Sequence, residues 1–228
     1  LLSQLYYGTN GTTFFETQVG PGQSVTVPSG VQVAYHSGIL SPTCRVDVTG
    51  GGALRIGGYL YVGTRGFSGG NYPDGRLAVR GGAFALTNMG TLYAGYNAHT
   101  ICAVSGVVDV SEASVESDGV ANRFAVRNTL AVGYRRAFGA LKLPPAVTNL
   151  TCGNLWIGAS YIGNAFPYSV LDLGTNPALT SVVITNDAMI NKAFITYHDG
   201  SMQKTGFPPN VAVRIGAPGA PGSLKLAS

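Results

Sequence analysis

A short pattern recurs through the middle of the chain: glycine, any residue, leucine or valine, any residue, and then a second apolar residue. Copies begin at Gly52, Gly58, Gly75, Gly90, Gly106, Gly139 and Gly153, and a variant with asparagine in place of glycine begins at Asn128. Because side chains alternate between the two faces of a strand, both apolar residues of a copy point to the same side. Each copy therefore predicts a three-residue strand with a buried pair, preceded by a glycine that forms a corner.

This alternation assigns a side to every residue of the pattern. The residues predicted to be buried in strands are Leu54, Ile56, Leu60, Val62, Leu77, Val79, Val108, Val110, Leu130 and Val132. The middle residues, predicted to point outward, are Arg55, Tyr61, Ala78, Tyr93, Asp109, Ala131, Lys142 and Trp156. Most of these middle residues are polar or aromatic, as the outer face of a sheet requires.

Very short strands separated by frequent corners favour an all-β fold of the β-solenoid type, similar to a parallel β-helix. In such a fold three short strands form a coil, and stacked coils cover each other's apolar surface. The spacing of the copies is uneven, whereas a fixed period is the usual signal of a solenoid. The alternative is an antiparallel β-sandwich or jelly roll. It is supported by four dipeptides typical of hairpin turns, which are Asn10-Gly11, Asp74-Gly75, Asp118-Gly119 and Asp199-Gly200.

Composition agrees with many strands and tight turns. The 228 residues include 33 glycines, and only 11% of them are charged, against roughly 25% in an ordinary domain. The net charge of +4 comes from scattered basic residues, so no nucleic-acid partner is expected. No apolar run reaches the roughly 20 residues of a membrane helix, so no membrane insertion is expected. Single helical turns are conceivable at 109–118 and 186–194, without a sustained helical stripe.

Changes in the pattern divide the chain into four segments. Residues 1–24 are aromatic and polar and indicate a cap or attachment segment, and residues 25–158 form the glycine-punctuated repeat region. Residues 159–215 indicate an irregular β-rich region, and residues 216–228 a flexible tail rich in glycine and proline. The start at Leu1, without a charged segment before an apolar run, indicates a signal peptide that is either absent or already removed.

The three cysteines, Cys44, Cys102 and Cys152, are far apart and form no Cys-x-x-Cys pair. They are interpreted as small buried apolar residues, with one disulfide plus one free thiol as the alternative. His36, His99 and His198 are isolated, so neither a metal site nor a cofactor is expected.

Two resemblances to known families follow from particular stretches. The segment from Val25 to Leu143, with Gly50-Gly51-Gly52 and Arg80-Gly81-Gly82, resembles the passenger repeats of self-associating autotransporter adhesins, and its composition is also similar to phage tail fibres and tailspikes. Residues 171–182 are similar to one leucine-rich repeat of bacterial surface proteins. Both resemblances imply an adhesion module on a cell surface or a virion.

One acidic cluster could carry chemistry. Asp109, Glu112, Glu116 and Asp118 fall within ten positions, and glycoside hydrolysis needs two carboxylates about 5 to 9.5 Å apart. The cluster is interpreted as a solvated loop between coils, with an active site or a calcium site as the alternative, although the spacing of a dedicated calcium loop is missing. No catalytic residue is assigned.

Aromatic residues in or beside the short strands are the candidate binding residues: Tyr61, Tyr93, Tyr96, Tyr134 and Trp156. Flat aromatic faces pack against sugar rings or proteins at little cost in entropy. The alternative explanation is the ordinary preference of tyrosine for strands.

These observations predict a non-enzymatic extracellular, cell-surface or virion module that binds a cell-surface glycan or protein. The alternative function is a polysaccharide-degrading β-helix enzyme, either a lyase or a hydrolase. The low charge content and the exposed end coils of a short solenoid also predict a homo-oligomer, with a trimer preferred. Its expected contact residues are Tyr6, Tyr7, Phe14, Phe15, Phe207 and the tail from Gly216 to Gly222.

Overall fold

The computed structural model shows an all-β protein. It describes residues 5–7, 14–36, 43–65, 73–97, 104–134, 137–158, 169–173, 179–186, 188–191, 193–196, 202–203, 212–217, 220–221 and 224–227. The strands are β1 (Leu5–Tyr7), β2 (Phe14–Val19), β3 (Ser24–Val27), β4 (Val31–His36), β5 (Thr43–Thr49), β6 (Ala53–Arg65), β7 (Asp74–Asn97), β8 (Val104–Ser117), β9 (Val120–Ala121), β10 (Arg123–Tyr134), β11 (Ala137–Lys142), β12 (Asn149–Ile157), β13 (Ser169–Asp172), β14 (Ser181–Ile184), β15 (Ala188–Asn191), β16 (Ala193–Thr196), β17 (Met202–Gln203), β18 (Ala212–Ala217), β19 (Ala220–Pro221) and β20 (Leu224–Ala227). No helix that could cross a membrane occurs in these ranges.

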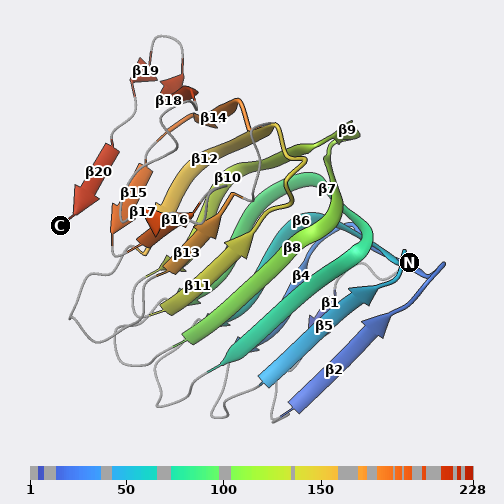
Figure 1. Ribbon diagram of the computed structural model, residues 1–228. Helices are drawn as coiled ribbons and strands as arrows, with labels where there is room; N and C mark the ends of the chain where they lie inside the picture. Colours follow the sequence, from blue (N-terminus) through green and yellow to red (C-terminus); the bar gives the residue numbers. More distant parts are fainter. Residues whose placement is uncertain are drawn as a thin grey trace.

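The strands stack in parallel into three ladders, which we call faces A, B and C (Figure 1). Face A contains β2, β5, the start of β7, β8, β11, β13 and β16. Face B contains β3, the first half of β6, the middle of β7 and the end of β8, and then the first halves of β10 and β12 with β14 and β18. Face C contains β1, β4, the second halves of β6, β10 and β12, the end of β7, and then β15 and β20.

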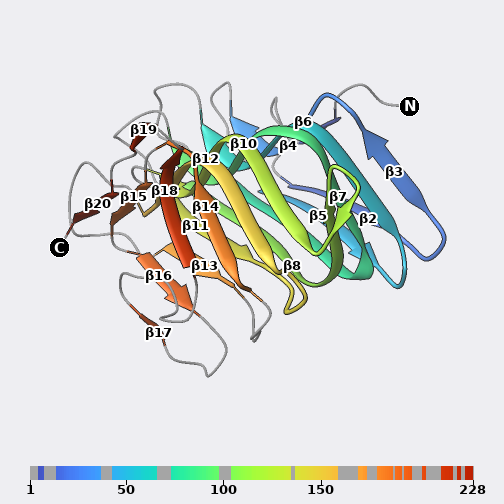
Figure 2. The same cartoon turned by 90° about the horizontal axis from the view of Figure 1, so that it is seen from above.

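The parallel pairings confirm the predicted β-solenoid over the antiparallel sandwich. Among the described strands, the antiparallel pairs are short: β8 with β9, β16 with β17, and β18 with β19. Seen from above, the ladders run side by side from β2 and β3 at one end to β18 and β20 at the other (Figure 2). The solenoid axis is therefore perpendicular to the strands.

The ladder register explains the uneven spacing of the sequence pattern. Leu60 of face C pairs with Leu92, which is 32 residues later, and Leu77 of face A pairs with Val108, which is 31 residues later. Successive copies of the pattern therefore alternate between faces, mostly A and C, and each coil takes about 30 residues. The period lies in the range of known solenoids, but it is visible only when copies on the same face are compared.

The strands are longer than the three residues predicted, because the ladders continue through the corners. Strand β7 spans 24 residues and contributes to all three faces. It turns at Gly81 and Asn88, whose φ angles are 64° and 49°. A left-handed residue changes the chain direction without breaking the hydrogen bonds on either side, so a corner does not end the strand.

The core occupies the interior of the solenoid and confirms the predicted buried set. All ten of those residues are in strands and are at most 1% exposed. Two of the residues predicted to point outward, Ala78 and Ala131, are nevertheless buried, at 1% and 0% exposed. Their side chains are so short that the longer side chains of neighbouring rungs cover them.

Strands replace the helical turns considered from the sequence. Residues 109–117 belong to β8, and the chain then turns at Asp118 and Gly119 into the β8–β9 hairpin. This hairpin inserts an additional strand into face B, since β8 pairs with β7 on one side and the first half of β10 pairs with β12 on the other. Strand β15 and the first two residues of β16 lie in the range 186–194.

The segment boundaries expected at residues 24 and 158 do not interrupt the ladders. Strand β2 pairs with β5 and β3 pairs with β6, while β13 to β16 extend the same faces beyond residue 158. In the last segment, β20 pairs with β15. Of the cysteines, Cys44 and Cys152 are free and buried, as predicted, and Cys102 lies outside the described residues. Burial raises the pKa of both thiols, that of Cys152 to about 12.

Glycines also occupy the positions at which the backbones of faces C and A come closest to each other. A Cβ atom on Gly106 would lie 2.1 Å from the backbone nitrogen of Gly95 and 2.1 Å from the carbonyl oxygen of Val62. One on Gly139 would lie 2.1 Å from the nitrogen of Gly133. Gly106 and Gly139 must therefore be glycine because the backbones of the two faces touch there and leave no room for a Cβ atom.

Candidate functional site: an aromatic ladder on face C

Five predicted aromatic residues come together on the outer side of face C. Tyr61 is in register with Tyr93, and Tyr96 with Tyr134, while Trp156 pairs with Ala131. Neighbouring rungs of a parallel sheet are about 4.8 Å apart, which matches the separation of stacked rings. The fold therefore arranges these side chains along the solenoid axis.

Left-handed glycines bring Tyr96 and Tyr134 onto the same side as Tyr93. Strict alternation would place residues 93, 95 and 97 outward. Gly95 has a φ of 70° and Gly133 a φ of 68°. Each of these residues turns the chain, so that the following tyrosine points outward, while Asn97 is 0% exposed.

The rings form one continuous stack, which we call the aromatic ladder. It also includes Tyr59, two residues before Tyr61. The centroid separations are 4.6 Å for Tyr59–Tyr61, 4.9 Å for Tyr61–Tyr93, 4.1 Å for Tyr93–Tyr96, 5.0 Å for Tyr96–Tyr134 and 4.9 Å for Tyr134–Trp156. The interplanar angles run from 7° to 29°. The three central contacts are nearly parallel.

Ala131 makes the uninterrupted stack possible. Its register neighbours are Tyr93 on one side and Trp156 on the other. A methyl group leaves room on this rung for the rings of Tyr96 and Tyr134, and these rings cover the alanine completely. Face B uses the same arrangement, where Arg55 passes over Ala85, which is 3% exposed, to reach the next rung.

The two end rings of the stack, Tyr59 and Trp156, have different neighbours. The Tyr59 ring lies against the backbone of Gly30, where a Cβ atom would be only 2.4 Å from a ring carbon. The Gln32 amide is 3.5 Å from the Tyr59 hydroxyl. At the other end, Trp156 is in register with Met189 of β15. Tyr59 is not among the five predicted binding residues, although it lies in or beside a predicted short strand and its spacing of two from Tyr61 places both residues on one side of that strand.

The stacking decides which parts of the rings remain accessible. The faces of Tyr61, Tyr93, Tyr96 and Tyr134 contact other rings on both sides, so these residues present ring edges and hydroxyl groups outward. All four are half-buried. Burial and the neighbouring phenols raise the pKa of Tyr61 and Tyr93 still further above neutral pH, where a phenol is in any case a protonated hydrogen-bond donor.

The acidic cluster does not form a common site, and the predicted solvated loop is wrong because three of its members lie in β8. Asp109 Oδ2 is 3.1 Å from Lys142 Nζ, and Asp109 Oδ1 accepts a 2.6 Å hydrogen bond from the Ser111 hydroxyl. Burial alone would raise the pKa of Asp109, but the hydrogen bonds from Ser111 and Lys142 and the charge of Lys142 outweigh it and lower the pKa.

The other three acidic residues have different surroundings. Glu116 forms an exposed ion pair with Arg55 at 3.0 Å. Asp118 accepts a 2.7 Å hydrogen bond from the backbone nitrogen of Asn88. Glu112 is exposed and lies one position after Ser111.

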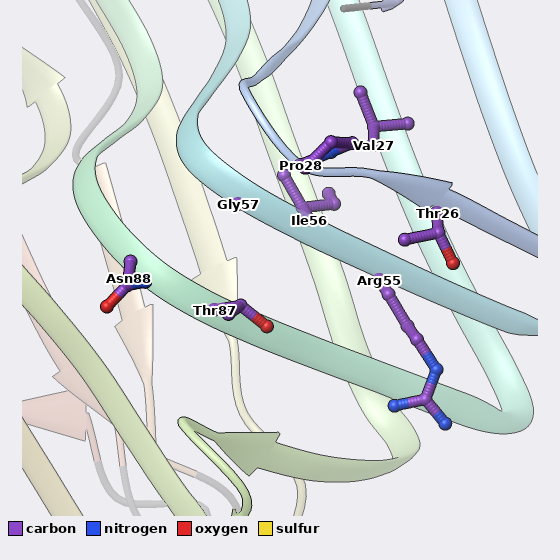
Figure 3. Close-up of a pocket in the computed structure, with 8 residues that line it drawn as sticks. All are labelled: Thr26, Val27, Pro28, Arg55, Ile56, Gly57, Thr87 and Asn88. Atoms are coloured by element: carbon purple, nitrogen blue, oxygen red, sulfur yellow. The ribbon is translucent and has the colours of Figure 1, made fainter. Parts of the chain in front are cut away.

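Two shallow grooves lie near these residues. One, of about 220 Å³, is on face B where β3, β6 and β7 meet, and the Arg55 side chain lies at one end of it and points from β6 over β7 (Figure 3). The other, of about 650 Å³, lies beside the turn at Pro144 and Pro145, and Glu112 is its one acidic lining residue. Neither groove brings two carboxylates together, and no cluster of potential metal ligands occurs among the described residues.

The aromatic ladder is therefore the most extended arrangement of candidate functional side chains in the described part of the chain. No protein-family model, curated protein or solved structure matches this chain.

Proposed function

We propose that this chain is a non-enzymatic structural and adhesion module of the extracellular or virion type, which binds a cell-surface glycan or protein. The aromatic ladder carries this proposal. It holds six rings at fixed spacing on one face of a rigid scaffold. A partner that lies along the solenoid axis would meet a row of ring edges and phenol donors. Aromatic side chains fixed in this way lose little entropy on binding.

The surroundings of the carboxylates favour this proposal over a polysaccharide-degrading enzyme. Such an enzyme needs an acid and a second carboxylate on opposite sides of the scissile bond. Asp109 is paired with Lys142 on the neighbouring strand, Glu116 is paired with Arg55 two strands away, and the Asp118 carboxylate accepts a hydrogen bond from the backbone nitrogen of Asn88. We expect that replacing all four acidic residues by Asn or Gln leaves polysaccharide turnover unchanged. Loss of a measured cleavage activity in that variant would favour the enzyme.

Binding to an array of immobilised glycans and extracellular proteins tests the proposal. The informative variant is the triple substitution Tyr61→Phe, Tyr93→Phe and Tyr134→Phe, which keeps the stacked rings and removes three hydroxyls. We expect at least tenfold weaker binding with an unchanged melting temperature. The control is Thr26→Ala, at an exposed position of β3 on another face. Unchanged binding by the triple variant, or equal loss in the control, would contradict a role for the ladder.

Self-association is a second part of the proposal. Strands β2 and β3 pair on one side only, with β5 and β6, among the described residues. Such an edge offers backbone donors and acceptors to another chain, so a homo-oligomer, and in particular a trimer, satisfies them. The side chains expected to form the contact, from Tyr6 to Phe15 and Phe207, lie outside the described side chains. Light scattering at micromolar concentration tests this, and a monomer mass would contradict it.

A further inference from the structure

We propose that the aromatic ladder is a site of oxidative cross-linking, at which dityrosine bonds join successive coils of the solenoid. Two ring pairs carry the inference because each joins residues of different coils. Tyr61 and Tyr93 have centroids 4.9 Å apart with an interplanar angle of 12°, and Tyr96 and Tyr134 are 5.0 Å apart with an angle of 9°. Between them, Tyr93 and Tyr96 are 4.1 Å apart. This inference does not depend on the proposed adhesion function.

The chemistry requires two phenoxyl radicals in contact. Each tyrosine loses one electron and one proton from its hydroxyl, and the unpaired electron spreads over the ring π system. Two radicals then couple through ring carbons beside the hydroxyls, and two hydrogens shift from carbon to oxygen to restore both phenols. In total two electrons and two protons are removed. A haem peroxidase transfers them to one molecule of hydrogen peroxide, which becomes two molecules of water.

The geometry favours this coupling because the spin density lies above and below the ring planes. Nearly parallel rings in van der Waals contact present these lobes directly to each other. The half-buried rings also limit the access of a second protein molecule, so coupling within the chain is favoured over coupling between chains.

The bonds would serve as covalent staples in a fold whose described cysteines are free. Cys44 and Cys152 are both buried and unpaired. A Tyr61–Tyr93 bond closes a loop of about 30 residues, which restricts the unfolded chain as a disulfide of that span does. We expect the melting temperature to rise by about 10 °C after oxidation.

Tryptic mapping of the oxidised full-length chain tests the proposal. Cleavage after arginine places Tyr59 and Tyr61 in peptide 56–65, Tyr93 and Tyr96 in peptide 81–123, and Tyr134 in peptide 128–135. The stacking order predicts cross-links between 56–65 and 81–123, and between 81–123 and 128–135. Each linked pair is two hydrogen atoms lighter than the sum of its peptides. Links between 56–65 and 128–135 are not expected, because their rings do not touch.

The matched variant is Tyr93→Phe, which keeps a stacked ring and removes the phenol. We expect it to lose the link between 56–65 and 81–123, to keep the link between 81–123 and 128–135, and to gain less in melting temperature on oxidation than the parent does. The denatured chain, oxidised in the same way, gives the pattern expected without the stack. The proposal is overturned if the folded protein yields no link between these peptides, gives the same pattern as the denatured chain, or links 56–65 to 128–135.

Discussion

At the contact between faces C and A, glycine substitutions can show separately how steric obstruction and how backbone conformation affect the stability of the fold. Gly106 lies at this corner and its φ is outside the left-handed region, so an alanine there meets only a steric obstacle. Its Cβ atom would be 2.1 Å from the Gly95 nitrogen and 2.1 Å from the Val62 oxygen. Both atoms belong to backbone that is held in the ladders by hydrogen bonds on each side. Gly106→Ala therefore requires the two faces to separate by about 1 Å.

The expected loss in the free energy of unfolding depends on which atoms must move to make room for the Cβ atom. Overpacking a core with flexible side chains usually costs about 1–3 kcal/mol. Here the obstructing atoms are backbone, so Gly106→Ala should lower the free energy of unfolding by about 3 kcal/mol or more. For a chain of this size, a loss of about 3 kcal/mol lowers the melting temperature by roughly 6–12 °C. Gly139→Ala, with Gly133 as the obstacle, should behave in the same way.

Two control variants isolate the other contributions. Gly81 has a φ of 64° with nothing within 4 Å of an added Cβ atom, so Gly81→Ala should cost only about 1–2 kcal/mol of conformational strain. Gly20 has neither problem, since its added Cβ atom would be 3.7 Å from the Gln23 side chain, and Gly20→Ala should change stability by less than about 0.5 kcal/mol. The assay is thermal and urea unfolding followed by circular dichroism. If Gly106→Ala is no more destabilised than Gly81→Ala, the backbones do not touch and the reasoning is refuted.

Four further outcomes are expected. Leu77→Ala should cost about 2–5 kcal/mol in urea unfolding because Leu77 is 0% exposed, and a cost below 1 kcal/mol would contradict tight packing. Ala34→Gly should stabilise by about 1 kcal/mol in the same assay, because Ala34 has a φ of 53°, and a loss of stability would contradict strain there. Because the pKa of Asp109 is lower in the folded protein than in the unfolded chain, Asp109 stabilises the fold above the pKa of the unfolded chain, and this stability is lost as the pH falls through the pKa of the folded protein. Lys142→Met removes part of the cause of the lowered pKa, so the melting temperature of this variant should fall less steeply at acidic pH than that of the parent. Ala131→Leu should separate the stacked rings and shift the fluorescence of Trp156, and an unchanged spectrum would show that Ala131 does not hold the stack together.

Much of the fold could be read from the sequence because it depends on local periodicity. The alternation around Leu54, Leu60 and Leu130 requires only that a strand has two sides and that one side is apolar. That rule identified the buried pairs and the all-β class, and the short distance between corners favoured a solenoid. The same rule placed Tyr61 and Tyr93 outward together.

Only the tertiary structure decided what lies above and below each residue. Register between coils places Ala131 between Tyr93 and Trp156, inside the aromatic ladder, which explains why an outward alanine is buried. Left-handed Gly95 brings Tyr96 onto the stack, which strict alternation does not predict. Likewise, Asp109 is adjacent to Lys142 because their rungs are neighbours, although 33 positions separate them in the chain. A strand's own sequence determines which side a residue faces, whereas its contacts depend on residues one coil away, about 30 positions along the chain.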